Sequence, residues 1–383
     1  MPEAVIVAAG RSPIGRATKG SLVDVRPDDM VGFVVRRVLE RLPALPPPEI
    51  DDLICGCGYP QGEAGMNIGR LAVFLSGLPD SVPGTTVNRF CASSLQAIRM
   101  AFHAIRAGEG GAFVCAGVES VSRVRRTPTD EEKNPLLVGD DACAQGYMAM
   151  GVTAENVADR YHVSRADMDL YALGSQQKAA RARDTGVFDR EIIPILTPSG
   201  AVVSADDGIR PDTTLEKLSQ LPPVFRPDGR VTAGNACPLN DGAAAVVVMS
   251  EQRAQELGIK PLARVVASSV SGLDPRYMGV GPIEAVRKVL AQARMSLDDI
   301  DVIELNEAFA SQVLAVSREL GWDMDKLNPH GGAIALGHPF GMTGARIMTA
   351  LLNDLRTLDG TFGLETMCVG GGQGMAMIVE RLN

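Results

Sequence analysis

The two ends of the chain carry related segments, and this repeat limits the possible folds more than any other feature of the sequence. Segment 261–275 (PLARVVASSVSGLDP) resembles segment 4–15 (AVIVAAGRSPIG), because each is a short apolar run followed by a turn with glycine or proline. Segment 362–374 (FGLETMCVGGGQG) resembles segment 111–120 (GAFVCAGVES), because each has a cysteine near a strand end before glycine. A repeat of this kind predicts a duplicated α/β unit.

Helical patterns alternate with these apolar runs. Strands are expected at 4–10, 51–58 and 111–120, and helices at 28–42 and 91–107. Gly108 supplies a stop signal for the second helix, and that helix has its counterpart in 340–355. The alternation predicts a mostly parallel sheet covered by helices, in which ligands gather where strands end and helices begin.

The middle of the chain is different. It is polar and helical around 150–184, proline-rich and without periodicity further on, and apolar again from 242. We therefore expect three parts. These are a first half (1–118 with 242–260), an inserted loop-rich segment (119–241) and a second half (261–383).

Composition excludes several classes of protein. A chain of 383 residues is long enough for more than one core. Its net charge of −9 argues against general nucleic-acid binding, which needs a basic face, although a local basic rim can still bind a small anion. No apolar run approaches the length of a membrane span, and the N-terminal segment with Glu3 is read as a first strand, not as a signal peptide.

Cysteine usage favours a reducing compartment. The seven cysteines are odd in number and scattered, so a disulfide framework is not expected and a cytoplasmic enzyme is. Cys55 and Cys57 form a CxC pair, but no further ligands stand at suitable spacing. They are therefore interpreted as packing residues and no metal site is expected.

Cys91, in NRFCASSLQAI (88–98), is the candidate nucleophile. It stands at the predicted start of a helix, where unpaired backbone N–H groups and the helix dipole favour a thiolate. A thiolate attacks thioesters and other acyl groups readily. A buried, inert cysteine is the alternative.

Two motifs in the second half add acid–base groups. His338, in GGAIALGHPFGMTGAR (331–346), follows a strand-like run and precedes a glycine turn, so it is expected to be exposed at a helix start and to serve as the base for a thiol. A structural histidine is the alternative. Cys368 precedes three glycines, whose backbone can approach a ligand, and it is a candidate for a second acid–base thiol.

Asn306, in ELNEAFA (304–310), closes a predicted strand and opens a predicted helix. Its amide can hold a water molecule or polarise a carbonyl, but simple N-capping of the helix explains it equally well. No Gly-Lys-Ser/Thr follows the glycines at 370–372, and no GxGxxG motif is followed by a distant acidic residue, so nucleotide-binding interpretations are weak.

Five sequence blocks together resemble the signature blocks of the thiolases, the acetyl-CoA C-acyltransferases. They are VNRFCASSLQAI, TAGNACPLNDGAA, NEAFA, GGAIALGHPFGMTGAR and CVGGGQGMA, in the family's order over nearly the whole chain. The resemblance implies the thiolase fold, with two βαβαβαββ halves in a five-layered α/β/α/β/α core and an inserted loop domain. It also implies acyl-CoA and coenzyme A as substrates, no tightly bound cofactor, and a homodimer or homotetramer.

The resemblance also implies residue roles. Cys91 matches the acylated nucleophile, His338 its base, and Cys368 the thiol that gives or takes the α-proton of the acetyl group. Asn306 matches an asparagine that holds a water, which with His338 forms one oxyanion hole. The backbone N–H groups of Cys91 and Gly370 match the other.

For coenzyme A, Arg210 matches a residue near the nucleotide, and Cys237 stands where many members have a serine that touches the pantetheine arm. Ala149 replaces a histidine found in short-chain biosynthetic members, and with Met150 it is expected to line the acyl pocket. Ser94 replaces a common glycine. These departures bear on the choice of substrate. The blocks NACPLNDGAAAVV and GHPFGMTGAR look most like those of thiolases that act on bulky or steroid side-chain acyl-CoAs, and a short-chain acetyltransferase that makes acetoacetyl-CoA is the alternative.

Two more distant functions are weighed against thiolysis. Ketoacyl synthases share the fold and the nucleophile, but their sites resemble Cys-His-His or Cys-His-Asn, so Cys368 before the glycines favours a thiolase. A non-catalytic acyl-CoA binder of this fold would be expected to lose Cys91, His338 or Cys368, and all three are present.

Overall fold

The computed structural model describes residues 2–124, 128–138 and 142–383. In the first half the elements are β1 (Ala4–Arg11), β2 (Gly15–Arg16), α1 (Pro27–Leu39), β3 (Asp52–Cys57), α2 (Ile68–Ser76), β4 (Gly84–Val87), α3 (Ser93–Ala107), β5 (Ala112–Ser120), β8 (Asn240–Ser250) and α7 (Glu251–Glu256). In the second half they are β9 (Ala263–Gly272), α8 (Gly281–Ala293), β10 (Val302–Leu305), α9 (Ala310–Leu320), α10 (Ala333–Leu336), α11 (Thr343–Thr357), β11 (Phe362–Val369) and β12 (Gln373–Arg381).

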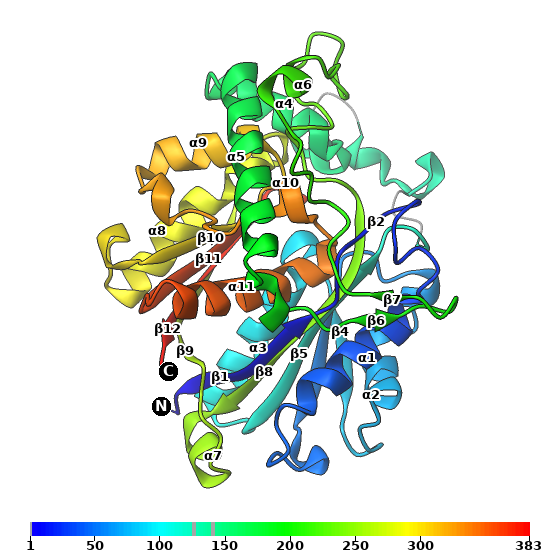
Figure 1. The fold of residues 1–383 in the computed structure, drawn as a ribbon, viewed down its shortest axis with the longest axis vertical. Coiled ribbons are helices and arrows are strands. Elements are labelled where there is room, and N and C mark those ends of the chain that lie inside the picture. Colours follow the sequence, from blue (N-terminus) through cyan, green and yellow to red (C-terminus); the bar gives the residue numbers. More distant parts are fainter. Residues whose placement is uncertain (1, 125–127, 139–141) are drawn as a thin grey trace.

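These elements stack in five layers (Figure 1). Helices α1 and α2 cover the outer face of strands β4, β3, β5, β8 and β1, and α8 and α9 cover the outer face of β9, β12, β11 and β10. Helices α3 and α11 lie between the two groups of strands and pack on each other. The α/β/α/β/α architecture that the resemblance to the thiolases implies is therefore confirmed.

The two halves also share one continuous sheet. Its strand order is β10-β11-β12-β9-β1-β8-β5-β3-β4, with β2 paired to β8. The junction between the halves is short, because β1 and β9 pair only through Val5 with Arg264 and Ile6 with Ala263. Packing of helices and strands, more than this ladder, therefore holds the halves together.

The expectation of a mostly parallel sheet is wrong. Strand pairs β3–β4, β3–β5 and β10–β11 are parallel, whereas β1–β8, β5–β8, β11–β12 and β12–β9 are antiparallel. Connection length explains part of this mixture. Only residues 370–372 join β11 to β12, and a parallel pair needs a crossover of roughly a dozen residues or more.

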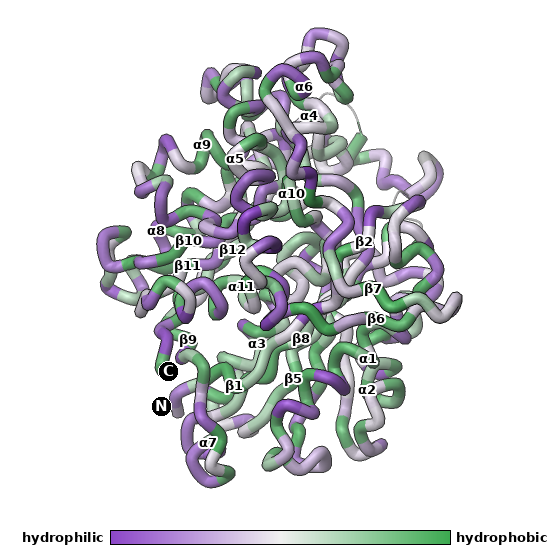
Figure 2. Tube along the Cα trace, viewed as in Figure 1, coloured by the Kyte–Doolittle hydropathy of each residue, from purple (hydrophilic) through white to green (hydrophobic). Residues whose placement is uncertain are grey.

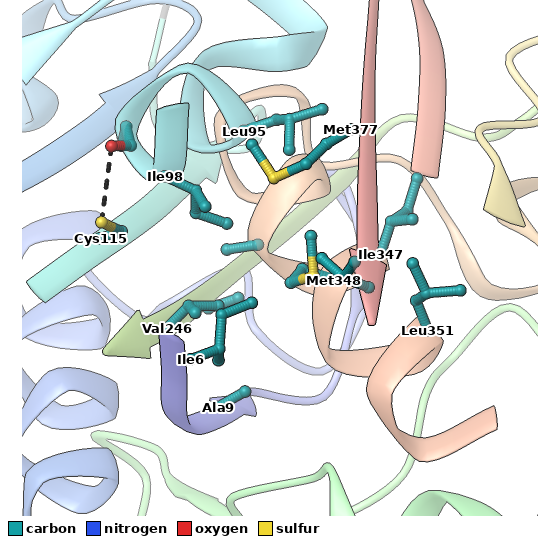
Figure 3. Close-up of a cluster of buried hydrophobic side chains, with 14 of the residues drawn as sticks. Ile6, Ala9, Leu95, Ile98, Cys115, Val246, Ile347, Met348, Leu351 and Met377 are labelled. Atoms are coloured by element: carbon teal, nitrogen blue, oxygen red, sulfur yellow. Dashed lines mark hydrogen bonds between the residues drawn. The ribbon is translucent and has the colours of Figure 1, made fainter. Parts of the chain in front are cut away.

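The central layer contains a large apolar cluster. One buried cluster contains Leu95 and Ile98 of α3, Ile347 and Leu351 of α11, and Val246 of β8 (Figure 3). Strand β8 is buried on both faces, because its alternate residues belong to the central cluster and to the cluster under α1. Apolar residues accordingly concentrate along β5 and β8 (Figure 2). Each fully buried aliphatic side chain of this kind contributes about 1.5–3 kcal/mol relative to exposure.

The inserted segment contains α4 (Met150–Arg160), α5 (Arg165–Asp184), the hairpin β6 (Ile195–Leu196) and β7 (Val202–Val203), and α6 (Leu215–Ser219). Helix α4 packs on α9 and α5 packs on α10, so much of the segment lies against the second half (Figure 1). Strand β5 extends to Ser120 and β8 begins at Asn240, so the sheet reaches two residues into the expected segment at each end.

Within the described residues, no helix is long and apolar enough to cross a membrane.

Candidate active site

Cys91 lies in a tight turn at the start of α3. A 3₁₀ turn over Phe90–Ala92 leads into the helix, and Phe90 is held at φ +43°, an uncommon conformation for a residue with a side chain. The helix start also approaches β3 very closely. A Cβ on Gly56 would lie 2.3 Å from the backbone nitrogen of Ser94, so only glycine fits there. This close packing fixes the position of Cys91, whose residue surface is 8% exposed.

The Cys91 thiol is surrounded by backbone donors. The backbone N–H groups of Gly370 and of Cys91 itself lie near the sulfur and favour its thiolate form, but burial outweighs them and raises the pKa of Cys91 to about 11. The nearby Glu119 carboxylate raises it further. The backbone N–H groups at the helix start therefore act in the expected direction, but burial keeps the thiol form favoured at neutral pH, so formation of the thiolate calls for a base.

His338 lies at the end of a short helix and not after a strand. Residues 333–336 form α10, and Gly337 then adopts φ +117° before the histidine. His338 is 1% exposed, so the expectation of an exposed histidine is also wrong. The backbone N–H of His338 donates to Asn240 Oδ1 at 2.9 Å, which fixes the main chain at this point.

The imidazole of His338 is held on both ring nitrogens. Nε2 lies 3.3 Å from Nδ2 of Asn306, and Nδ1 lies 2.6 Å from Oγ1 of Thr343. The ring of Phe340 meets the imidazole edge-on, with centroids 5.0 Å apart. Burial, and secondarily the charge of Arg346, lower the pKa of His338 to about 3. The ring is therefore neutral at pH 7 and able to accept a proton.

Asn306 follows β10 directly and is completely buried. Helix α9 begins at Ala310 with Phe309 as its N-cap residue, so Asn306 does not cap it and the capping alternative is wrong. Its Nδ2 faces His338, whereas its Oδ1 has no hydrogen-bond partner within the described part of the chain. A buried carbonyl oxygen of this kind is suited to a bound water or a substrate donor.

Cys368 lies near the end of β11 and is fully buried. Burial raises the pKa of Cys368 well above its usual value, and the neighbouring thiols of Cys91 and Cys237 raise it further. The turn that follows contains Gly371 at φ +79° and Gly372 at φ +82°, a geometry that favours glycine. It brings the Gly370 N–H to the Cys91 sulfur, so the two cysteine-bearing blocks meet as expected.

The residues expected to bind coenzyme A lie around this centre. Cys237 donates its backbone N–H to Ala308 O at 3.1 Å, which places it beside the segment after Asn306. Arg210 lies at the surface, and its pKa is lowered by partial desolvation and by the neighbouring Arg16. Its loop packs on α10, because a Cβ on Gly208 would lie 2.3 Å from Ala335 O.

Ala149 and Met150 mark the start of α4. Ala149 is exposed and forms the N-cap position without a side-chain hydrogen bond, and Met150 is partly buried. Neither makes a contact with Cys91 or His338 that would assign its role, so their place in an acyl pocket stays a prediction.

Sequence reasoning missed several residues that position these groups. Thr343 contacts the His338 ring, and its place five residues after the histidine, at the first turn of α11, is a signal that could have pointed to it. Glu119 is buried and accepts N–H bonds from Gly58 and Gly341, which ties the loop after β3 to the turn after His338. No local sequence pattern brings these distant segments together.

Ser94 has a use that the sequence left unexplained. Its Oγ, on α3, accepts the N–H of Ala345 in the first turn of α11 at 2.8 Å. It thus satisfies a backbone donor of the neighbouring helix, as a capping side chain does. Among the described residues, no group of three or more histidine, cysteine or acidic side chains is placed to hold a metal ion.

The chain matches two family models. The model of the thiolase N-terminal domain covers residues 4–252 and that of the thiolase C-terminal domain covers residues 259–381. Among solved structures, human mitochondrial 3-ketoacyl-CoA thiolase in complex with CoA is similar, with a TM-score of 0.92 and 38% identity over 100% of this chain and 98% of that one. Bacillus anthracis acetyl-CoA acetyltransferase has a TM-score of 0.91 and 40% identity, covering 100% and 99% of the two chains.

Full-length relatives agree. The 3-oxoadipyl-CoA/3-oxo-5,6-dehydrosuberyl-CoA thiolase of Escherichia coli strain K12 is 46% identical over 406 residues, covering 100% of both chains. The 3-ketoacyl-CoA thiolase of Bacillus subtilis strain 168 is 44% identical over 392 residues, covering 99% of this chain and 100% of the relative. With both family models matched and relatives similar along their whole length, the chain belongs to the thiolase family.

Proposed function

We propose that the thiols of Cys91 and Cys368 and the imidazole of His338 perform the CoA-dependent thiolytic cleavage by which this thiolase acts as an acyltransferase. The observation that supports the proposal is their burial as neutral groups in one packed region. Cys91 is close enough to Cys368 to raise its pKa, the backbone N–H of Gly370 lies near the Cys91 sulfur, and the turn with Cys91 packs on the turn that follows His338. A neutral thiol beside a neutral base is able to form a thiolate only when the reaction demands it.

In the first half-reaction, His338 Nε2 takes the proton from Cys91. The thiolate adds to the 3-keto carbon of a 3-oxoacyl-CoA, and the bond between C2 and C3 breaks. The electron pair of that bond passes to C2 as the enolate of acetyl-CoA, which Cys368 protonates. Acetyl-CoA leaves, the shortened acyl group stays on Cys91, and Cys368 is left as a thiolate.

In the second half-reaction, coenzyme A replaces acetyl-CoA. The Cys368 thiolate takes the proton of the coenzyme A thiol, which attacks the acyl carbon on Cys91. Cys91 leaves as a thiolate and recovers its proton from His338. Proton transfer by Cys368 contributes on the order of 10²–10⁴ in rate.

Two sets of donors stabilise the developing oxyanions. The N–H groups of Cys91 and Gly370 form one set, and their convergence on the Cys91 sulfur supports it. His338 and a water held by Asn306 form the other, supported by the unpartnered buried Oδ1 of Asn306. Each donor of this type is worth about 10²–10³ in turnover.

For the substrate, we propose 3-oxoacyl-CoA esters longer or bulkier than acetoacetyl-CoA, such as those of fatty acid β-oxidation or steroid side-chain degradation. Relatives named for 3-oxoadipyl-CoA and 3-ketoacyl-CoA support this class. The alternative, a short-chain acetyl-CoA acetyltransferase, is favoured by the Bacillus anthracis structure of that name. Arg210 would lie near the nucleotide of coenzyme A, Cys237 near the pantetheine arm, and Ala149 and Met150 near the acyl group.

We also expect a cytoplasmic homodimer or homotetramer. Support for a reducing compartment comes from the cysteines of the described residues that can be assigned, because Cys55, Cys57, Cys91, Cys115, Cys237 and Cys368 are all free.

Acyl transfer to Cys91 provides the test. After the enzyme is mixed with a 3-oxoacyl-CoA and quenched, peptide mass spectrometry should find the acyl group on the peptide that carries Cys91. Cys91→Ala should lose both the adduct and turnover. An adduct that persists in Cys91→Ala, or normal turnover by that variant, would show that another residue is the nucleophile.

A further inference from the structure

The hydroxyl of Thr343 lies between the His338 ring and a backbone carbonyl. Its Oγ1 is 2.6 Å from Nδ1 of His338 and 2.8 Å from the carbonyl oxygen of Pro339. Thr343 and His338 are both buried, so neither hydrogen bond is shared with bulk solvent. The geometry therefore limits where the single hydroxyl proton can be.

Only one placement of the protons allows the Thr343 hydroxyl to keep both its bond to the Pro339 carbonyl and its bond to His338 Nδ1. The Pro339 carbonyl accepts only, so the Thr343 hydroxyl must donate its proton there. The hydroxyl oxygen is then left as an acceptor toward the ring, and His338 Nδ1 must carry the proton. In a neutral imidazole the other nitrogen, Nε2, then holds a lone pair.

Contacts on the other side of the ring agree with this arrangement. Nε2 faces Nδ2 of Asn306 at 3.3 Å, and an amide nitrogen donates. If Nε2 carried the proton instead, two donors would face each other there. The single hydroxyl proton of Thr343 could then reach either Nδ1 or the Pro339 carbonyl, so one of the two bonds would be lost. Burial keeps the ring neutral, so the choice between the two tautomers is a real one.

We propose that Thr343 is a positioning residue that holds His338 in the Nδ1–H tautomer, so that Nε2 is free to accept the Cys91 proton. The inference rests on the proposed role of His338 as the base. It adds a residue that acts only through His338, in the way that the partner of a catalytic histidine's second nitrogen selects its tautomer. The turn that carries Cys91 packs against Phe340–Met342, the turn just before Thr343, so nucleophile, base and positioning residue belong to one packed unit.

The wild-type enzyme provides the first measurement. Histidine labelled with ¹⁵N on the ring distinguishes Nδ1–H from Nε2–H in long-range ¹H–¹⁵N spectra, and the chain has only four histidines. The His338 signals are identified by their loss in His338→Asn. We expect the Nδ1–H form at pH 7. A protonated Nε2 in the wild-type enzyme overturns the inference without any variant of Thr343.

Variants then test the cause. Thr343→Val removes the acceptor for Nδ1–H and should shift the ring to Nε2–H, whereas Thr343→Ser restores the hydroxyl and the wild-type tautomer. Turnover should fall on the order of 10²-fold in Thr343→Val and less than about tenfold in Thr343→Ser. Alkylation of Cys91 by iodoacetamide, followed on its own peptide, should slow in parallel. A folded Thr343→Val that keeps Nδ1–H overturns the inference.

Thr349 supplies a matched control on the same helix. Its hydroxyl makes the equivalent bond to the carbonyl four residues earlier, Ala345 O at 2.7 Å, and the residue is also buried. Thr349→Val loses this bond alone and should keep the His338 tautomer and near-normal turnover. A loss of turnover in Thr349→Val equal to that of Thr343→Val would assign the effect to helix α11 and overturn the inference.

The proposed role of His338 as the base and the inferred role of Thr343 can be tested separately. If His338→Asn retains normal turnover, His338 is not the base and the proposed function is wrong at that residue. If His338→Asn is inactive but Thr343→Val changes tautomer and remains fully active, His338 keeps its role and only the inference about Thr343 is overturned.

Discussion

Two opposing effects set the protonation state of Cys91, the proposed nucleophile. Backbone N–H groups stabilise a thiolate, whereas burial, which dominates, raises the pKa of Cys91 to about 11. Burial also disfavours the positively charged form of His338, because it lowers the pKa of that imidazole to about 3. A resting ion pair of these two side chains is therefore disfavoured, and the proton moves only during attack.

Alkylation measures the resting state of Cys91 directly. Because the thiol has a pKa of about 11, its fraction of thiolate grows about tenfold per pH unit below that value, and the rate with iodoacetamide should rise throughout pH 7–10 without a plateau. The rate is followed by mass spectrometry on the Cys91 peptide, so that Cys368 and Cys237 do not contribute. A rate that is constant between pH 6 and 9 would indicate a preformed thiolate–imidazolium pair instead.

Cys368 and His338 should have separable roles. Exchange of the acetyl-CoA α-protons with deuterated water needs Cys368 as base but needs no acyl-enzyme. Cys368→Ser should lose exchange while still accepting an acyl group on Cys91, and His338→Ala should be poor at acylation. Nuclear magnetic resonance of acetyl-CoA follows the first reaction and peptide mass spectrometry the second. Exchange at the wild-type rate in Cys368→Ser would contradict the assignment.

At the scale of elements, the strands that carry the site also carry buried acids behind it. Glu304 of β10 and Glu365 of β11 are register partners on adjacent parallel strands, and both are buried. Arg346, from the first turns of α11, lies 4.0 Å from Glu304, and within the described residues neither carboxyl oxygen of Glu365 has a hydrogen-bond partner. One arginine cannot balance two adjacent carboxylates, so a carboxyl here retains its proton.

This cluster makes stability depend on pH. Burial raises the pKa of Glu365 well above its usual value, with Arg346 opposing and Glu304 adding to the shift. The folded state therefore keeps a proton that the unfolded chain loses above about pH 4.5, and folded stability falls as pH rises from there, by about 1.4 kcal/mol per unit for this group. The loss ends at the folded-state pKa.

Glu365→Gln removes that dependence. Its unfolding free energy relative to wild type should increase between pH 5 and pH 8, measured by urea denaturation at each pH. Glu319→Gln, at an exposed position on α9, controls for the loss of a carboxyl in general. If the difference in unfolding free energy between wild type and variant stays constant over this pH range, Glu365 is already ionised in the folded state.

Prediction from sequence succeeded where a pattern repeats along the chain. Strand β8 and the matched pairs β1 with β9 and α3 with α11 follow from apolar periodicity, and Gly108 ends α3 in the left-handed conformation as expected. The predicted strand directions were wrong, because the direction of a strand relative to its neighbour depends on which strands pair across the sheet. Segment 333–336 was taken for a strand because four apolar residues fit either period, and the structure makes it α10.

For the site as well, features that depend on local sequence could be predicted, whereas features that depend on distant segments could not. Cys91, His338, Cys368 and Asn306 could be singled out from their blocks, and the structure brings Cys91 to the Gly370 backbone and His338 to Asn306. Burial could not be predicted, because it is imposed by segments far away in sequence. For the same reason neither the raised pKa of Cys91 nor the contact of Glu119 with Gly341 was foreseen.

At the scale of the whole molecule, we expect the inserted segment to determine which acyl groups the enzyme accepts. Ala149 is exposed at the start of α4, so a side chain there has room. It stands at the position where the pattern of short-chain biosynthetic thiolases has a histidine. A wider, more apolar wall gains about 0.8 kcal/mol per buried CH₂, and one or two methylenes then give roughly tenfold discrimination.

We therefore expect kcat/KM for thiolysis to rise from acetoacetyl-CoA to longer or bulkier 3-oxoacyl-CoA esters. Ala149→His should reduce the rates with bulky substrates more than the rate with acetoacetyl-CoA, which serves as the internal control. A wild-type profile that peaks at acetoacetyl-CoA would instead favour the short-chain acetyltransferase.

The central layer has a consequence for synthesis of the protein. Helix α3 finds its partner α11 only after about 250 further residues have been made, which takes roughly 12–50 s at 5–20 residues per second on the ribosome. During that time the nascent chain presents the apolar face of Leu95 and Ile98 without helix α11 to cover it. We therefore expect the emerging polypeptide to need chaperones that shield apolar helices, and Cys91 to remain without His338 until translation is almost complete.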